Sequence, residues 1–182
     1  MKPPMNADVT SDPLVAFYLG RSTDTEGRRL EDIWTWGNDK LEGTHDYIQW
    51  LFPLRKRSKF NPGAPTLTSE TIDAFMKNNE LRKRLTTSLE IMLKFYGLKS
   101  LVADDGIIEI SKAPDFNARR LKWLTPMNHN FLRLTRILKS LQILGLSNWA
   151  HALFACLNEI YHTNSSEIGA ETFAYWKAAA SP

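Results

Sequence analysis

The sequence predicts an all-α fold: an irregular multi-helix single domain with at most a minor two-stranded hairpin. Apolar side chains recur at spacings of three and four along most of the chain, as on one face of a helix. Capping residues and glycines separate these stretches. No repeat of about 20 to 50 residues is present, which argues against a solenoid.

The length and composition of the chain predict one domain with one buried core. The chain has 182 residues, and 43% of them are hydrophobic. We expect residues 1–11 to form a flexible arm and residues 12–180 to form a single helical domain. No apolar run reaches the roughly 18 residues of a membrane span, and no export signal is visible. The single cysteine, Cys156, is typical of a reducing compartment, so we expect a cytoplasmic protein with a buried thiol.

The N-terminal elements are short and have clear start and stop signals. Asp12 is the expected N-cap of a helix over residues 13–19, which begins with a proline. A second helix is expected over residues 28–36, where Gly37 ends it. A linker of residues 37–44 then leads into the stretch "HDYIQWLFPL".

Longer helices follow. Thr68 is expected to cap a helix that runs to Lys77, and a helix over residues 80–96 repeats leucines on one face until Gly97 stops it. Asp105-Gly106 lies between two aliphatic runs and predicts the hairpin. After Asp115 and Pro126, three further helices and an alanine-rich C-terminal helix are expected over residues 116–124, 128–144, 148–162 and 170–180.

The stretch of residues 45–54 concentrates aromatic side chains on a short helical turn. On a helical wheel, Tyr47 and Trp50 occupy one side, while His45 and Gln49 share another. A segment that is apolar on two faces must lie inside the fold. We interpret His45 and Gln49 as satisfied core groups, with a ligand-facing role as the alternative.

Three stretches carry a family resemblance. They are "NDKLEGTHDYIQWLFPL", "LRKRLTTSLEIMLKFYGLK" and "NFLRLTRILKSLQILG". Over about residues 14–160 the chain resembles the conserved N-terminal region of the opioid growth factor receptor family. It resembles a stand-alone version of this region, for which a microbial source is one option. The resemblance implies recognition of an enkephalin peptide and control of growth, without catalytic activity. Vertebrate members of the family are nuclear or membrane-associated.

The helix over residues 128–144 is apolar nearly all round yet contains Arg133 and Arg136. At least one of these arginines is therefore expected to be buried, and a buried guanidinium needs acceptors. The main interpretation is an internal ion pair, and the alternative is a pocket for an anion or a peptide carboxylate. Possible internal partners are Asp39, Glu42 and Asp46.

The local concentration of positive charge is the loop "RKRSK", with Arg55, Lys56, Arg57 and Lys59. The net charge of +3 is too small to mark a dedicated nucleic-acid binder. A solvated loop is the main interpretation, and contact with phosphate groups or nucleic acid is the alternative.

No reaction is visible in the sequence. Glu159 and His162 have a metal-ligand spacing, but a second such pair is missing, and no catalytic triad or nucleotide fingerprint is recognisable. We expect no metal and no cofactor. The predicted function is non-enzymatic binding of an unknown peptide, small-molecule or protein ligand, with a nucleic-acid module as the alternative and an enzyme third. The predicted ligand-binding residues are His45, Tyr47, Gln49, Trp50, Arg133 and Arg136.

Overall fold

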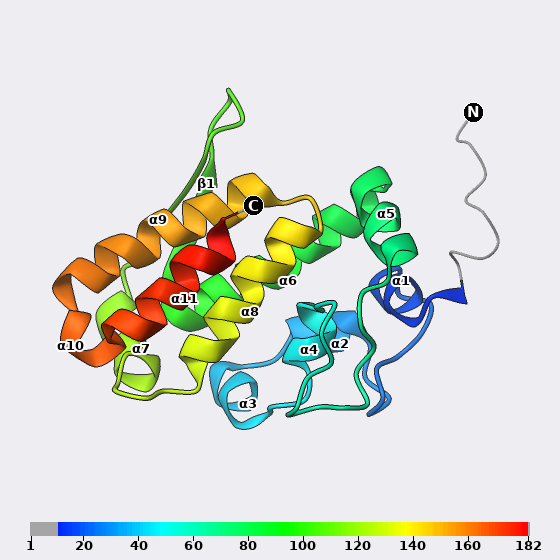
Figure 1. Ribbon diagram of the computed structural model, residues 1–182, viewed down its shortest axis with the longest axis horizontal. Coiled ribbons are helices and arrows are strands. Elements are labelled where there is room, and N and C mark those ends of the chain that lie inside the picture. The colour runs from blue at the N-terminus through cyan, green and yellow to red at the C-terminus, as the bar shows by residue number, and fades with distance from the viewer. Residues whose placement is uncertain (1–10, 182) are drawn as a thin grey trace. The chain divides into compact units, whose positions relative to one another are not determined.

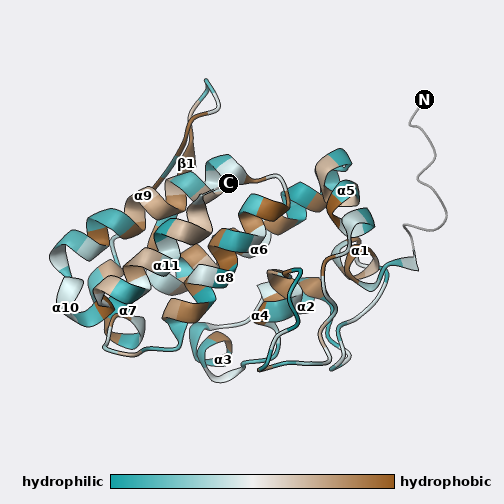
Figure 2. Ribbon diagram, viewed as in Figure 1, coloured by the Kyte–Doolittle hydropathy of each residue, from teal (hydrophilic) through white to brown (hydrophobic). Residues whose placement is uncertain are grey.

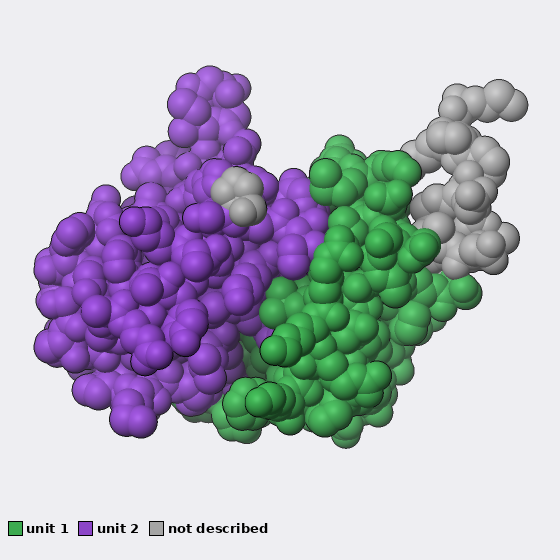
Figure 3. Space-filling model, in the orientation of Figure 1, with its two compact units in different colours: residues 1–88 green, residues 89–182 purple. Residues whose placement is uncertain are grey.

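The computed structural model describes residues 11–181 and confirms the all-α class (Figure 1). The described residues form eleven helices and one two-stranded antiparallel hairpin. The predicted arm, residues 1–11, lies outside them apart from Ser11. The chain divides into two compact units, unit 1 up to Ser88 and unit 2 from Leu89 (Figure 3). One domain over residues 12–180 therefore stays a prediction.

Two helices of unit 1 begin at the predicted caps, whereas the helix expected over residues 28–36 is shorter, at Leu30–Trp34, and ends before Gly37. An Asp12 side-chain oxygen accepts hydrogen bonds from the first turn of α1, and Thr68 caps α5. The linker expected over residues 37–44 is wrong, because a short helix forms there around the buried Leu41. Burial outweighs the poor helix propensity of this stretch. The helices are α1 (Pro13–Tyr18), α2 (Leu30–Trp34), α3 (Asn38–Gly43), α4 (Ile48–Leu51), α5 (Ser69–Lys77) and the first part of α6 (Asn79–Tyr96).

Aromatic rings fill the core of unit 1. The ring of Phe17 lies 5.1 Å from that of Trp50, and the ring of Tyr18 lies 5.1 Å from that of Phe75. The Tyr18 hydroxyl donates a hydrogen bond to the carbonyl of Leu51. These contacts confirm that residues 45–54 anchor the core.

Unit 2 is built around three helices that pack pairwise, α8 (Asn130–Ile143), α9 (Ser147–Thr163) and α11 (Ala170–Ala180). The remaining elements are the second part of α6, β1 (Leu98–Val102), β2 (Ile108–Lys112), α7 (Phe116–Trp123) and α10 (Ser165–Ile168). The sequence did not predict α10. Ser147 is the first residue of α9 and not its cap, a position that Leu146 occupies.

The predicted hairpin pairs β1 with β2 in an antiparallel register from Leu98↔Lys112 to Val102↔Ile108. It projects from the helices of unit 2 (Figure 1), and its base packs against α9. Hydrophobic residues continue along the strands (Figure 2), and Leu101 is 65% exposed. Among the helices of unit 2, the buried indole of Trp123 donates a hydrogen bond to the carbonyl of Tyr96, and that of Trp176 donates one to the carbonyl of Phe131.

Cys156 lies in the core of unit 2, as predicted. Burial is the main cause that raises the pKa of its thiol to about 11, and the charge of Glu159 adds to it. The reactive form of cysteine is the thiolate. We therefore expect almost no reaction with a thiol reagent at about pH 8, and complete reaction of the one thiol in denaturant, where an unperturbed pKa is about 8.5. Rapid labelling of the native protein would contradict this assignment.

Candidate ligand-binding site

Three of the four predicted ligand residues of segment 45–54 are part of the core. Tyr47, Gln49 and Trp50 are buried, and the Tyr47 hydroxyl donates to the carbonyl of Leu41 at 3.0 Å. His45 is exposed and precedes α4, which begins at Ile48. The interpretation of His45 and Gln49 as one buried polar pair is therefore wrong for His45. The helical turn was expected to include His45, but it begins only at Ile48.

An ion-pair network that the sequence did not reveal supports this segment. The Arg28 guanidinium contacts Asp24 through Nε at 2.6 Å and Asp46 through Nη1 at 2.8 Å. Burial disfavours its charge, but the hydrogen bonds to Asp46 and Asp24 outweigh this effect and raise the pKa of Arg28. The guanidinium also lies over the ring of Trp36, 5.4 Å from its centroid. Asp46 was expected as a partner for an arginine of α8, and the structure gives it this ion pair with Arg28.

The two predicted arginines of α8 lie in unit 2. Arg133 is buried, which confirms that a guanidinium of this helix is buried, and its Nη1 donates to Asn130 Oδ1 at 3.3 Å. Arg136 is half-buried, and burial lowers the pKa of its guanidinium. The predicted ligand residues therefore come from both units, and their joint role stays a prediction.

The basic loop is solvent-exposed at Arg55, Lys56, Arg57 and Lys59. Next to it, the side chain of Phe60 is 79% exposed. The hydroxyl of Ser58 accepts a hydrogen bond from the backbone N–H of Phe60 at 3.1 Å, which fixes the loop at this point. An exposed ring thus follows four exposed cations along the chain.

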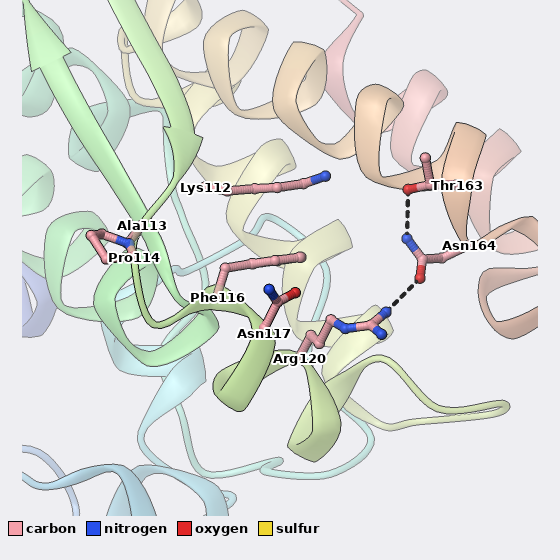
Figure 4. A pocket seen from close by; sticks show the side chains of 8 residues that line it. All are labelled: Lys112, Ala113, Pro114, Phe116, Asn117, Arg120, Thr163 and Asn164. Carbon is pink, nitrogen blue, oxygen red and sulfur yellow. Dashed lines mark hydrogen bonds between the residues drawn. The ribbon is translucent and has the colours of Figure 1, made fainter.

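A pocket of about 420 Å³ opens in unit 2 where three elements meet (Figure 4). The end of β2, the first turns of α7 and the end of α9 form its walls. Lys112, Phe116 and Arg120 all point toward the end of α9 (Figure 4). The lining residues are Lys112, Ala113, Pro114, Phe116, Asn117, Arg120, Thr163 and Asn164.

A glycine turn positions α7 at this pocket. Gly97 has φ +74°, and a Cβ atom there would meet Phe116 Cα and Arg119 Cβ at 2.8 Å each. A side chain at this position would push the first turn of α7 away. The backbone N–H of Ala113 donates to the carbonyl of Gly97 at 2.8 Å, which ties the end of the hairpin to the same turn.

The charge of the pocket is positive. Among the residues that the structure describes, neither Lys112 nor Arg120 forms an ion pair with a carboxylate, and no acidic residue lines the space. The ammonium group of Lys112 lies over the ring of Phe116, 5.2 Å from its centroid. Such a site attracts an anion. The sequence did not predict this pocket, because its two cations come from separate elements. The amide of Asn164, which also lines it, lies 44 residues from Arg120 along the chain.

Neither a metal-binding cluster nor a membrane-spanning helix is found among residues 11–181. Residues 11–181 contain no group of three or more His, Cys, Asp or Glu side chains that could hold a metal ion. None of the helices formed by these residues combines the length and apolar character needed to cross a bilayer.

The fold and this pocket define a mostly helical domain with a cationic, partly aromatic cavity in its second unit. Its sequence matches the opioid growth factor receptor conserved region over residues 14–180, and the chain belongs to this family. That match confirms the resemblance carried by residues 38–54, 81–99 and 130–145.

Named relatives share this region. Opioid growth factor receptor-like protein 1 of Xenopus tropicalis is 41% identical over 137 residues, which are 73% of this chain and 26% of that protein. The opioid growth factor receptor of Homo sapiens is 42% identical over 125 residues, or 66% of this chain and 18% of that protein. The chain thus spans about a quarter or less of these relatives.

A bacterial protein of a different kind also matches. Membrane-bound lytic murein transglycosylase C of Photorhabdus laumondii is 33% identical over 101 residues, which are 52% of this chain and 28% of that protein. No solved structure matches the chain significantly.

Proposed function

We propose that this chain is a non-enzymatic ligand-binding domain and that the pocket of unit 2 receives part of the ligand. The observation that carries the proposal is a concave site lined by two cations, an aromatic ring and amide groups. These groups can attract and orient an anion. No carboxyl side chain among the described residues lines the pocket, so it lacks a proton donor of the kind with which a glycosidic bond is cleaved, and it does not support the activity named for the bacterial relative.

The ligand class follows from the family. The relative from Homo sapiens is named opioid growth factor receptor. We extend this ligand class, an enkephalin peptide, to the present chain. A cytoplasmic location remains our proposal from composition.

Calorimetric titration with an enkephalin peptide tests the function. We expect saturable binding, and none for a peptide with the same residues in scrambled order. Lys112→Gln removes one pocket cation and should weaken binding, whereas Lys99→Gln, on the exposed side of β1, should leave it unchanged. Absence of saturable binding to the wild-type chain would contradict the proposal.

A second candidate function is contact with single-stranded nucleic acid through residues 55–60. Exposure of the Phe60 ring beside four exposed cations favours it, because cations hold phosphates while aromatic rings stack on bases. Binding of a single-stranded RNA oligonucleotide, followed by fluorescence anisotropy, should then weaken with salt. Four phosphate contacts give a slope of about −3 in a plot of log K against log salt concentration.

Neutral replacement of Arg55, Lys56, Arg57 and Lys59 together separates the two roles of the loop. We expect the free energy of unfolding to change by less than about 0.5 kcal/mol, because these side chains face solvent. Loss of RNA binding in this variant, together with weaker binding by Phe60→Ala, would favour the second candidate. Absence of RNA binding by the wild type would exclude it.

A further inference from the structure

The guanidinium of Arg120 is held in a fixed orientation at the pocket. Its Nη1 donates to Asn164 Oδ1 at 2.9 Å. The amide nitrogen of Asn164 in turn donates to the carbonyl of Ile160 at 2.9 Å and to Thr163 Oγ1 at 2.8 Å. Since both ends of the Asn164 amide are engaged, the carboxamide cannot rotate without breaking these bonds. Figure 4 shows this chain of contacts from Arg120 to Thr163.

The other edge of the same guanidinium lacks a partner. Nε of Arg120 is buried without an acceptor, and Nη2 has none among the described residues. A buried N–H without an acceptor is costly. Nε and Nη2 together form the fork with which arginine holds a carboxylate or a phosphate through two parallel hydrogen bonds. Here Nε is closed to solvent, so Nη2 is the donor of this fork that a ligand in the pocket reaches.

Two further donors border the space. The side chain of Lys112 points the same way as that of Arg120 (Figure 4). The backbone N–H of Asn117, in the first turn of α7, has no acceptor among the residues that the structure describes. N–H groups at the start of a helix favour negative charge.

The neighbouring carboxylates do not neutralise the fork. Asp115 is paired with Arg119 at 3.1 Å. Glu167 accepts a hydrogen bond from Ser166 at 2.7 Å, which is the main cause of its lowered pKa, and the charge of Arg120 adds to this effect. Arg120 thus acts on Glu167 through its field, without an ion pair between them.

A purely structural role explains only part of this arrangement. α9 ends at Thr163, and a cation near its last carbonyls stabilises the helix. This accounts for the contact between Arg120 and Asn164. It does not account for the unpartnered Nε–Nη2 edge, nor for a second cation directed into the same space.

We infer that this pocket binds an oxyanion, a carboxylate or a phosphate group, at Nη2 of Arg120, with Lys112 as the second cation. The volume of about 420 Å³ is in the range of small-molecule sites, so the anion belongs to a larger ligand. For that larger ligand the inference rests on the proposed ligand-binding function, whereas binding of the anion alone can be tested separately.

The chain offers a matched internal control for the test. Arg119 lies next to Arg120 on α7, but its Nε already donates to Asp115 at 3.1 Å. We would titrate the ¹⁵N-labelled protein with sodium acetate and with inorganic phosphate, at constant ionic strength and near-neutral pH, and follow the arginine Nε–H signals by NMR.

The Arg120 Nε–H signal should shift with a saturable curve, while that of Arg119 stays unchanged. Saturation by acetate alone identifies a carboxylate site, and saturation by phosphate alone identifies a phosphate site. Equal or linear shifts at Arg119 and Arg120, which indicate an adventitious ion only, would overturn the inference.

Variants complete the test. Arg120→Gln should weaken binding of the effective anion at least about tenfold, the usual worth of a charge-assisted hydrogen bond, while Arg119→Gln should not. If Arg120→Gln unfolds, Arg120→Lys, which keeps the charge but loses the fork, and Lys112→Gln give the same comparison.

The outcomes also separate this inference from the proposed function. Anion binding without enkephalin binding would leave the oxyanion site standing and refute the peptide ligand. Peptide binding that Arg120→Gln and Lys112→Gln leave unchanged would keep the peptide as a ligand and refute this pocket as the place where it binds.

Discussion

Trp50→Ala should lower the free energy of unfolding by about 3 to 5 kcal/mol, the usual cost of truncating a buried tryptophan. The indole is 4% exposed and packs against Phe17 at a centroid distance of 5.1 Å. Truncation would leave a cavity that the surrounding helices can fill only in part, since protein interiors are close-packed. Chemical denaturation of the wild type and the variant measures the difference.

Phe60→Ala is the matched control for this prediction. Its ring is 79% exposed, so its removal leaves no cavity, and we expect a change of less than about 0.5 kcal/mol. A denaturation midpoint for Trp50→Ala as close to the wild type as that of Phe60→Ala would refute the core assignment. The segment of residues 45–54 would then have to be a binding surface.

The elements that the sequence predicted well are those with strong local signals. The helix expected over residues 80–96 is found at Asn79–Tyr96, because leucines repeat on one face and Gly97 adopts a positive φ at its end. The hairpin followed equally from Asp105-Gly106. Local signals failed at α3, where burial of the single residue Leu41 decides the structure.

The candidate site depended on contacts that no local pattern contains. Lys112 ends a strand, Arg120 lies on the following helix, and Asn164 follows α9, so a resemblance centred on residues 38–54 did not point to them. The cluster "KAPDFNARR" at the start of α7 was the available signal, and it read as an ordinary helix start. The network of Arg28 was missed for the same reason, because Asp46 lies 18 residues away.

Arg28→Met should destabilise the protein by about 3 kcal/mol, the lower end of the range for breaking a buried ion pair. The side chain of Asp24 is 0% exposed and loses the guanidinium at 2.6 Å. Its Oδ1 keeps two backbone hydrogen bonds, from Glu26 and from residue 28, each at 2.9 Å. The carboxylate therefore stays partly compensated, and for this reason we expect the lower end.

Lys77→Met is the matched control, because Lys77 also pairs with an aspartate four residues away, but on the surface. The side chains of that pair are 78% and 68% exposed, and such pairs contribute less than about 1 kcal/mol. A double-mutant cycle between Arg28→Met and Asp46→Asn, whose aspartate is 41% exposed, isolates the second contact and should give a smaller coupling. Equal destabilisation by Arg28→Met and Lys77→Met in chemical denaturation would show that the buried carboxylate does not depend on Arg28. In that case the packing of the aromatic core alone would hold residues 45–54 in place.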